Sequence, residues 1–228
     1  IGGLMLWLVY VDLGETAQKS SKSLIGQFKE YPELLRSPRF WGYSLAAAFC
    51  SGSFFAYLGG APFVGTEVFG MGPSELGFYF GAPAIGYFLG NFLSGRYATT
   101  FGVNRMVLWG CIANAMGTFA SLAIFVIGLG SPLSFFGMMV FVGLGNGLVI
   151  PNATAGMLSV RPHLAGTASG LGGAIMIGGG AALSALAGLL LTPETGAFPL
   201  VGIMCATGVC AMLAIGAVYR RERRLALA

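Results

Sequence analysis

Long apolar segments recur along the chain and are separated by short polar connections. An α-helix rises about 1.5 Å per residue, so about 22 residues are enough to cross a hydrocarbon core of about 30 Å. No segment shows the sustained period-two alternation that a membrane barrel strand needs. The pattern predicts an all-α membrane protein with six transmembrane helices, at approximately Phe40–Val64, Leu76–Ala98, Arg105–Ile127, Leu133–Leu158, Leu164–Leu191 and Phe198–Tyr219.

The residues before the first span divide into two parts. Residues 1–11 are apolar but shorter than the roughly 20 residues of a spanning helix, so we interpret them as the end of a preceding transmembrane helix. Residues 12–39 form a linker, and its segment Ser23–Ser37 has apolar residues at helical spacing with basic residues around them. This pattern is typical of an amphipathic helix on the membrane surface. Ser37 and Pro38 are suited to begin the next helix, as its N-cap and its first turn.

Basic residues predict the orientation of the spans, because cytoplasmic loops are enriched in Lys and Arg. The connections alternate between basic ones and ones with no basic residue, and all 12 basic residues fall on one side. Three acidic residues, Glu67, Glu75 and Glu194, lie on the other side. We expect the basic loops and the tail at 220–228 to be cytoplasmic. The basic groups are Lys19, Lys22, Lys29, Arg36 and Arg39; Arg96 and Arg105; Arg161; and Arg220, Arg221, Arg223 and Arg224.

The composition agrees with a lipid environment. Charged residues make up 9% of the chain, the apolar fraction is 56% and the mean hydropathy is +0.80, whereas a soluble domain carries about 25% charged residues. The net charge of +4 comes from scattered loop residues, which argues against a nucleic-acid partner. The four cysteines, which lie in apolar runs without metal-binding spacing, read as packing residues: Cys50, Cys111, Cys205 and Cys210.

No ionisable side chain falls deep within a predicted span. Proton relays in membranes usually need buried Asp, Glu, His or Arg, so we expect any proton-coupling residue to lie outside this chain. The chain has no phosphate-binding loop of the G-x-x-x-x-G-K-[ST] type, which argues against ATP hydrolysis. We therefore predict no catalytic residue, no metal and no cofactor.

The most distinctive stretch runs from Gly143 to Thr154. Pro151 lacks a backbone donor and disturbs the helix around it, and Asn146 and Asn152 are polar residues at membrane depth. Two interpretations are open. The stretch is either a bending gate helix whose asparagines face a cavity, or a tightly packed kinked helix with interhelical asparagine bonds.

Two further groups of residues are open to packing and ligand roles. Aromatic residues that include Phe54, Tyr57 and Tyr79 cluster in the first two spans, where they form either an interfacial ring or the wall of an apolar substrate pocket. The span Leu164–Leu191 carries rows of small residues four apart, for which close helix packing is the favoured interpretation.

Several runs resemble drug resistance transporters of the Bcr/CflA type, within the major facilitator superfamily. The run Leu34–Tyr43 resembles the start of that family's second half, and Gly143–Pro151 with Ser159–Gly170 resembles its tenth-to-eleventh helix region. Gly90, Arg96, Gly102 and Arg105 resemble a degenerate cytoplasmic loop motif of the superfamily. The run departs from that motif at Ser94 and Gly95, where an acidic residue is usual, so a charge-relay gate at this loop is in doubt.

The resemblance implies the C-terminal half of a twelve-helix fold, made of two three-helix units of inverted topology. It implies proton-driven export of small amphipathic drugs by alternating access in the bacterial inner membrane, with the proton-binding residues in the first half. Two alternatives stay open: a metabolite exporter or importer of the same fold, and a membrane subunit that transports nothing.

Overall fold

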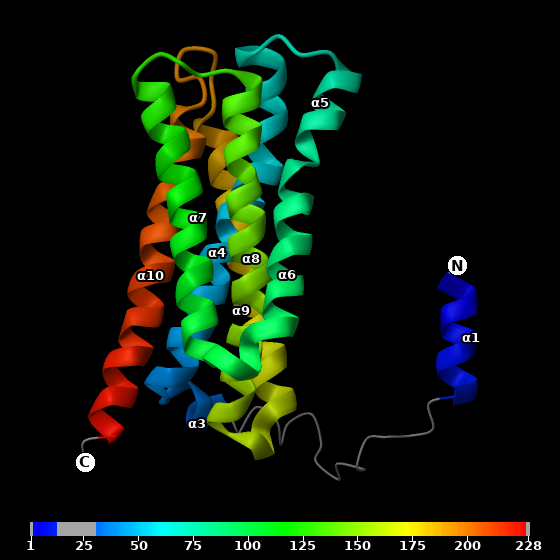
Figure 1. Ribbon diagram of the computed structural model, residues 1–228, viewed down its shortest axis with the longest axis vertical. Coiled ribbons are helices and arrows are strands. Elements are labelled where there is room, and N and C mark those ends of the chain that lie inside the picture. Colours follow the sequence, from blue (N-terminus) through cyan, green and yellow to red (C-terminus); the bar gives the residue numbers. More distant parts are fainter. Residues whose placement is uncertain (1, 13–30, 227–228) are drawn as a thin grey trace.

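The computed structural model describes residues 2–12 and 31–226. Every described element is helical (Figure 1). In chain order they are α1 (Gly2–Asp12), α3 (Tyr31–Leu35), α4 (Pro38–Phe63), the π-helical turn Val64–Val68, α5 (Pro73–Phe80), α6 (Ala82–Phe101), α7 (Val103–Val126), α8 (Pro132–Val160), the 3-10 turn Pro162–Leu164, α9 (Ala165–Leu190) and α10 (Phe198–Ala226).

The prediction of an all-α membrane fold is confirmed. Within the described residues, five helices are long and apolar enough to cross a membrane, and each corresponds to a predicted span: Pro38–Val68, Val103–Val126, Pro132–Val160, Pro162–Leu190 and Phe198–Arg224.

The segment predicted as one span over Leu76–Ala98 differs, because it is broken at Gly81 into α5 and α6. Pro83 has no N–H to donate to the carbonyl of Tyr79, and the N–H of Gly81 bonds to that carbonyl instead. Together α5 and α6 still run the length of the bundle (Figure 1), so they make the sixth crossing in two pieces.

The start of α4 follows the sequence prediction. The Ser37 hydroxyl accepts a hydrogen bond from the backbone N–H of Phe40 at 3.4 Å, and Pro38 lies in the first turn. Of the amphipathic helix expected over Ser23–Ser37, residues 23–30 lie outside the described part of the chain. Its described end forms the short helix α3, with Leu34 buried against the bundle.

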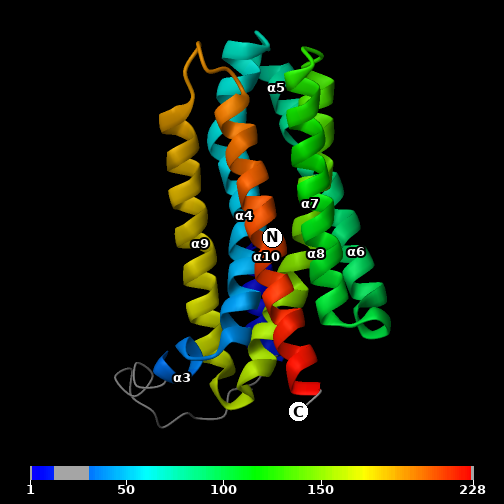
Figure 2. The same ribbon diagram turned by 90° about the vertical axis from the view of Figure 1, so that its left-hand side faces the viewer.

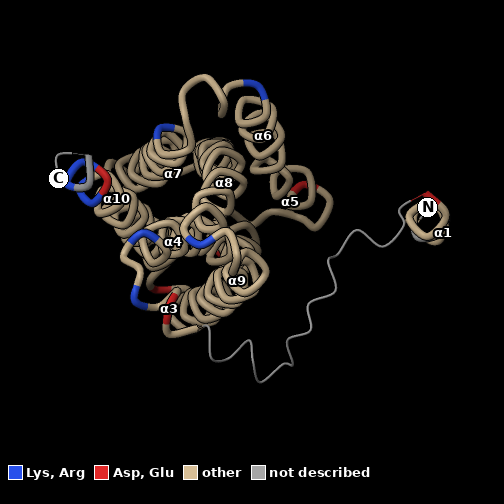
Figure 3. The backbone as a smooth tube through the Cα atoms, turned by 90° about the horizontal axis from the view of Figure 1, so that it is seen from below, with Lys and Arg blue, Asp and Glu red and all other residues tan. Residues whose placement is uncertain are grey.

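The helices pack in two interleaved groups of three. In one group α4 lies between α9 and α10, and in the other α8 lies between α6 and α7 (Figures 2 and 3). In chain order, α4, α6 and α7 form one three-helix unit, and α8, α9 and α10 form the other. The first helix of each unit therefore packs on the second and third helices of the other unit. Helices α4 and α8 run in opposite directions (Figure 1) and contact each other at the centre.

Glycines set the closest helix approaches. A Cβ atom on Gly143 would overlap the carbonyl oxygen of Pro83 in α6, and one on Gly147 would lie 2.6 Å from the Tyr87 carbonyl oxygen. Gly145 points the other way, and its Cβ would lie 2.6 Å from the carbonyl oxygen of Gly110 in α7. Alternate glycines of α8 thus let it contact two helices at once, on opposite faces.

The basic residues gather at one end of the bundle. That end holds Arg39, Arg96, Arg105, Arg161 and the arginines that end α10, together with Glu33 and Glu222, which pair with Arg161 and Arg39. The far end holds Glu67, Glu75 and Glu194. The core between them forms two clusters of buried apolar side chains, one toward each end.

Candidate functional site

A cavity of about 500 Å³, here called the main cavity, opens between α4, α6, α8 and α9, next to the break at Gly81. Its wall is mainly aromatic and aliphatic, and among its described residues none is Asp, Glu, His, Lys or Arg. The small Gly81, Ala84 and Gly143 leave the space that the larger side chains surround. The lining residues are Ser51, Phe54, Phe55, Leu58, Phe80, Gly81, Pro83, Ala84, Tyr87, Gly143, Asn146, Ile150 and Met176.

Asn146 contributes the amide group of this wall. Its Nδ2 donates to the carbonyl oxygen of Cys50 in α4 at 3.2 Å and to that of Val142 at 3.0 Å. Its Oδ1 is buried and has no hydrogen-bond partner among the described residues. The two carbonyl acceptors fix the orientation of the amide, because a flipped amide would place oxygen against oxygen. Asn146 therefore keeps an unsatisfied acceptor beside the cavity.

Asn114 in α7 makes a matching contact away from the cavity. Its Nδ2 donates to the same Cys50 carbonyl at 3.3 Å and to the Cys50 sulfur at 3.1 Å, and its side chain is buried. The pair of asparagines joins α4, α7 and α8 through one backbone oxygen. Asn114 thus makes a helix–helix contact only, whereas Asn146 both joins helices and lines the cavity.

The aromatic candidates from the sequence fall in different places. Phe54 lines the cavity. Tyr57 is fully buried, its hydroxyl donates to the Phe80 carbonyl at 2.8 Å, and its ring stacks on Phe80 with 5.1 Å between centroids. Tyr79 packs against Phe136 at 5.7 Å. Tyr57 and Tyr79 are outside the cavity lining, and Tyr57 supports the wall at Phe80.

The proline and the second asparagine of α8 also separate. Asn152 is buried, and its Nδ2 donates to the Ser94 hydroxyl of α6 at 2.7 Å and to the Leu148 carbonyl at 2.8 Å. Pro151 is exposed, and α8 stays helical on both sides of it. The structure therefore places Asn152 in an interhelical contact and Pro151 on the open face of α8.

The residues of the resembled loop motif also separate. Gly90 packs against α8, where its Cβ would lie 2.9 Å from Gly147. Gly102 has a φ of 82°, which suits glycine at the turn between α6 and α7. Arg96 is exposed, and Arg105 lines a second cavity at the basic end.

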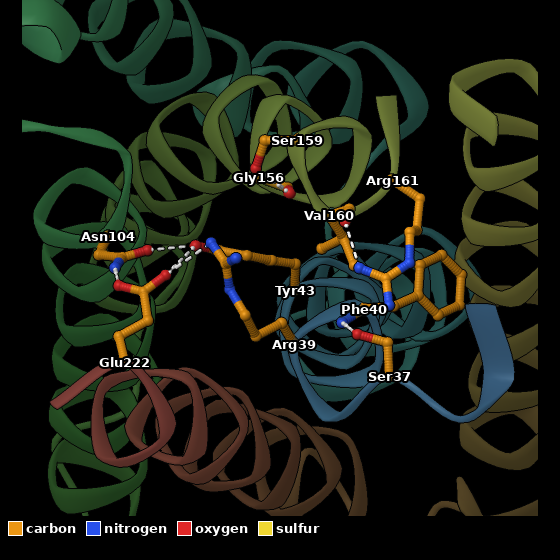
Figure 4. Close-up of polar contacts among 10 residues, drawn as sticks. All are labelled: Ser37, Arg39, Phe40, Tyr43, Asn104, Gly156, Ser159, Val160, Arg161 and Glu222. Carbon is orange, nitrogen blue, oxygen red and sulfur yellow. Dashed lines mark hydrogen bonds and ion pairs between the residues drawn. The ribbon is translucent and has the colours of Figure 1, made fainter. Parts of the chain in front are cut away.

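That second cavity has a volume of about 570 Å³ and borders a polar cluster (Figure 4). The cluster, here called the Glu222 cluster, consists of Arg39 and Tyr43 in α4, Asn104 in α7 and Glu222 in α10. Arg39 pairs with Glu222 at 2.8 Å, the Tyr43 hydroxyl donates to the Asn104 Oδ1, and the Asn104 Nδ2 donates to Glu222. These contacts connect three helices at their basic ends.

This cluster was not predicted from the sequence. Its signal was Glu222, the one acidic residue among the four arginines Arg220, Arg221, Arg223 and Arg224. An acid in such a position indicates a partner, and Arg39 at the start of α4 supplies it. The charged pair joins two helices that lie far apart in the chain.

The described residues contain no group of three or more His, Cys, Asp or Glu side chains arranged to hold a metal ion. All four cysteines are free, and three of them are buried. The cavity wall itself offers apolar contact and aromatic stacking, together with a few polar groups, namely the amide of Asn146 and the hydroxyls of Ser51 and Tyr87.

Comparisons with known proteins agree with this architecture. The family profile described as the Major Facilitator Superfamily matches residues 1–185. The chain is 30% identical over 218 residues to an uncharacterized MFS-type transporter, YdgK, of Bacillus subtilis (strain 168), covering 94% of this chain and 53% of that protein. It is 25% identical over 224 residues to a bicyclomycin resistance protein homolog of Haemophilus influenzae, covering 96% of this chain and 54% of that protein. No solved structure matches the chain. The chain thus spans about half the length of these relatives.

Proposed function

This chain belongs to the major facilitator superfamily of membrane transporters, and on that premise we propose that it forms the C-terminal six-helix half of a proton-coupled exporter. The proposed substrates are small amphipathic drugs. The two halves would move relative to each other in alternating access. The similarity to a bicyclomycin resistance protein homolog supports a drug as the substrate class.

The main cavity is the observation that carries the proposal. Its aromatic and aliphatic wall suits the apolar part of an amphipathic molecule, and the Asn146 amide suits one polar group. A sugar or another highly polar metabolite would need more hydrogen-bonding groups than the described wall offers. We assign Phe54 and Asn146 to the substrate cavity, and Pro151 and Asn152 to the gate helix that moves beside it. Tyr57 and Tyr79 are assigned to the support of its wall.

Proton coupling is assigned to residues outside this chain, because the described cavity wall has no acidic or basic side chain. The basic end is proposed to face the cytoplasm of a bacterial inner membrane, since all 12 basic residues lie on that side of the predicted spans. In this arrangement Arg96, Gly102 and Arg105 shape the cytoplasmic ends of α6 and α7, and Gly90 holds the middle of α6 against α8.

Transport by the complete gene product tests the proposal. The protein is reconstituted in vesicles with equal concentrations of the dye Hoechst 33342 on both sides, and a proton gradient is imposed across the membrane. We expect a dye concentration difference to build up, with the dye moving opposite to the protons, and to vanish when an ionophore collapses the proton gradient. A protein that inserts correctly but moves no dye or antibiotic would contradict the exporter. Movement along the proton gradient, in the same direction as the protons, would instead indicate an importer.

A further inference from the structure

A groove runs along α10 toward the basic end, where α10 passes the start of α4. It has a volume of about 410 Å³. The α10 residues that line it fall on one helical face at spacings of three and four. Pro38 lies on the α4 side of the groove, and the α10 residues are Met212, Leu213, Gly216, Ala217, Arg220, Arg221 and Arg224.

This single face changes character along its length. Its inner part is apolar and open, since Leu213 is 69% exposed and no atom lies within 4 Å of a Cβ built on Gly216. Its outer part consists of Arg220, Arg221 and Arg224, all exposed. From Leu213 to Arg224 the helix rises by roughly 16 Å. An apolar channel that ends in three arginines matches a ligand with an apolar tail and an anionic head.

The neighbouring acids do not neutralise these arginines. Glu222 lies in the same turn of α10 but pairs with Arg39 and bonds to Asn104. Glu33 at this end pairs with Arg161 at 2.8 Å. Within the described residues, Arg220, Arg221 and Arg224 form no ion pair with an acidic side chain. The positive charge above the groove is therefore available to an external anion.

We propose that this groove binds an anionic phospholipid. The phosphate lies among Arg220, Arg221 and Arg224, and one acyl chain follows the surface of Leu213, Gly216 and Ala217. Arginine is the suited partner, because its guanidinium group presents several donors to phosphate oxygens. Juxtamembrane arginines near an anionic leaflet each strengthen binding by roughly fivefold. The site is independent of the transport proposal, since it faces the surface of the bundle rather than the main cavity.

The test compares variants of the complete protein in nanodiscs that contain phosphatidylcholine with a small fraction of phosphatidylglycerol. Lipid that stays bound is counted by native mass spectrometry after release from the nanodisc. The triple variant R220Q/R221Q/R224Q removes the arginines of the groove. The matched control R223Q removes an arginine of the same turn that does not line the groove. We expect the triple variant to lose phosphatidylglycerol retention by roughly tenfold or more, and R223Q to retain it.

A second variant separates a built site from general attraction to charge. Gly216→Leu keeps every arginine and places a side chain into open space within the groove, so it blocks the acyl chain without a clash inside the protein. We expect it to reduce retention as well. Unchanged retention in Gly216→Leu, or an equal loss in R223Q, would overturn the site in favour of general charge attraction. Thermal stabilisation of the protein by inorganic phosphate equal to that by phosphatidylglycerol would overturn the lipid as the ligand.

Discussion

At the residue scale, the carbonyl oxygen of Cys50 explains how a polar group is kept at membrane depth. It accepts from Asn114 and Asn146 on two different helices. Each amide then keeps an oxygen without a described partner, but only Asn146 borders the main cavity. Since an unsatisfied buried acceptor is costly, a substrate that displaced the side chains covering the Asn146 Oδ1 and donated to it would form a hydrogen bond that the described residues do not supply.

This difference between the two asparagines gives a matched pair of variants. Asn146→Leu keeps the size of the side chain but removes the acceptor beside the cavity, so we expect the KM for export to rise by roughly threefold to tenfold. Asn114→Leu removes the same type of bond to Cys50 away from the cavity, so its KM should change less than about twofold. Initial export rates over a range of substrate concentrations measure both. Equal increases in KM would mean that the shared Cys50 contact matters and the cavity acceptor does not.

The Glu222 cluster gives a prediction about stability. Arg39 and Glu222 have side chains that are 33% and 32% exposed, so solvent screens their attraction only in part. We expect a double-mutant cycle with Arg39→Gln and Glu222→Gln to give a coupling energy of roughly 1 kcal/mol. Unfolding midpoints in detergent supply the measurement.

The exposed pair of Glu33 and Arg161 is the reference for that cycle. Their side chains are 47% and 46% exposed, and we expect a coupling energy below about 0.5 kcal/mol. The Tyr43 hydroxyl also lies 3.3 Å from Glu222. If the two cycles gave the same value, the contacts of Glu222 with Tyr43 and Asn104 would not strengthen its attraction to Arg39.

At the scale of elements, α8 depends on glycines for its place between α6 and α7. Gly143→Ala would force its new methyl group against the Pro83 backbone, and backbone atoms cannot move away as a flexible side chain can. We expect it to lower the free energy of unfolding by about 1–3 kcal/mol. Gly137→Ala in the same helix meets no atom within 4 Å and should be neutral or slightly stabilising. Equal destabilisation of both variants would contradict the role of Gly143 as a contact point.

Pro151, in the same helix, affects the bending of α8 rather than its packing contacts. Its missing N–H leaves the carbonyl of Gly147 without its helical partner, at the residue where α8 packs on α6. Pro151→Ala restores that donor, so we expect a straighter α8 and slower export, while membrane insertion stays normal. Export rates compared at equal amounts of inserted protein test this. Unchanged rates would count against α8 as a gate.

At the scale of the whole molecule, hydropathy and charge predicted the spans well for a physical reason. Lipid requires every backbone group to be bonded within a helix, so long apolar runs have one available structure. The break at Gly81 was missed, although Pro83 marks it, because the apolar run continues through it without a polar residue. Ser37 and Pro38 were predicted correctly as the start of α4 because capping is a local property.

The site was harder to predict than the spans. A helix that is apolar on all sides does not show which face meets which neighbour, so the interleaving of α4 with α9 and α10 could not be read from the sequence. For the same reason, aromatic identity alone could not separate Phe54 at the cavity from Tyr57 behind its wall. Asn146 could be singled out because a polar side chain within a span needs a partner. Glu222 also pairs across helices, with Arg39. The arginines next to it in the sequence offered nearer partners, so the sequence did not indicate this pair.

Orientation is also a property of the whole molecule, and it can be measured directly. With the native cysteines replaced, single cysteines are introduced at Glu194 on the far end and at Thr100 on the basic end, both exposed positions. Because basic loops stay in the cytoplasm, a membrane-impermeant maleimide should label Glu194→Cys in intact cells. It should label Thr100→Cys only after the cells are permeabilised. The reverse pattern would place the basic end outside, and the Glu222 cluster and the lipid groove would then face the outer leaflet.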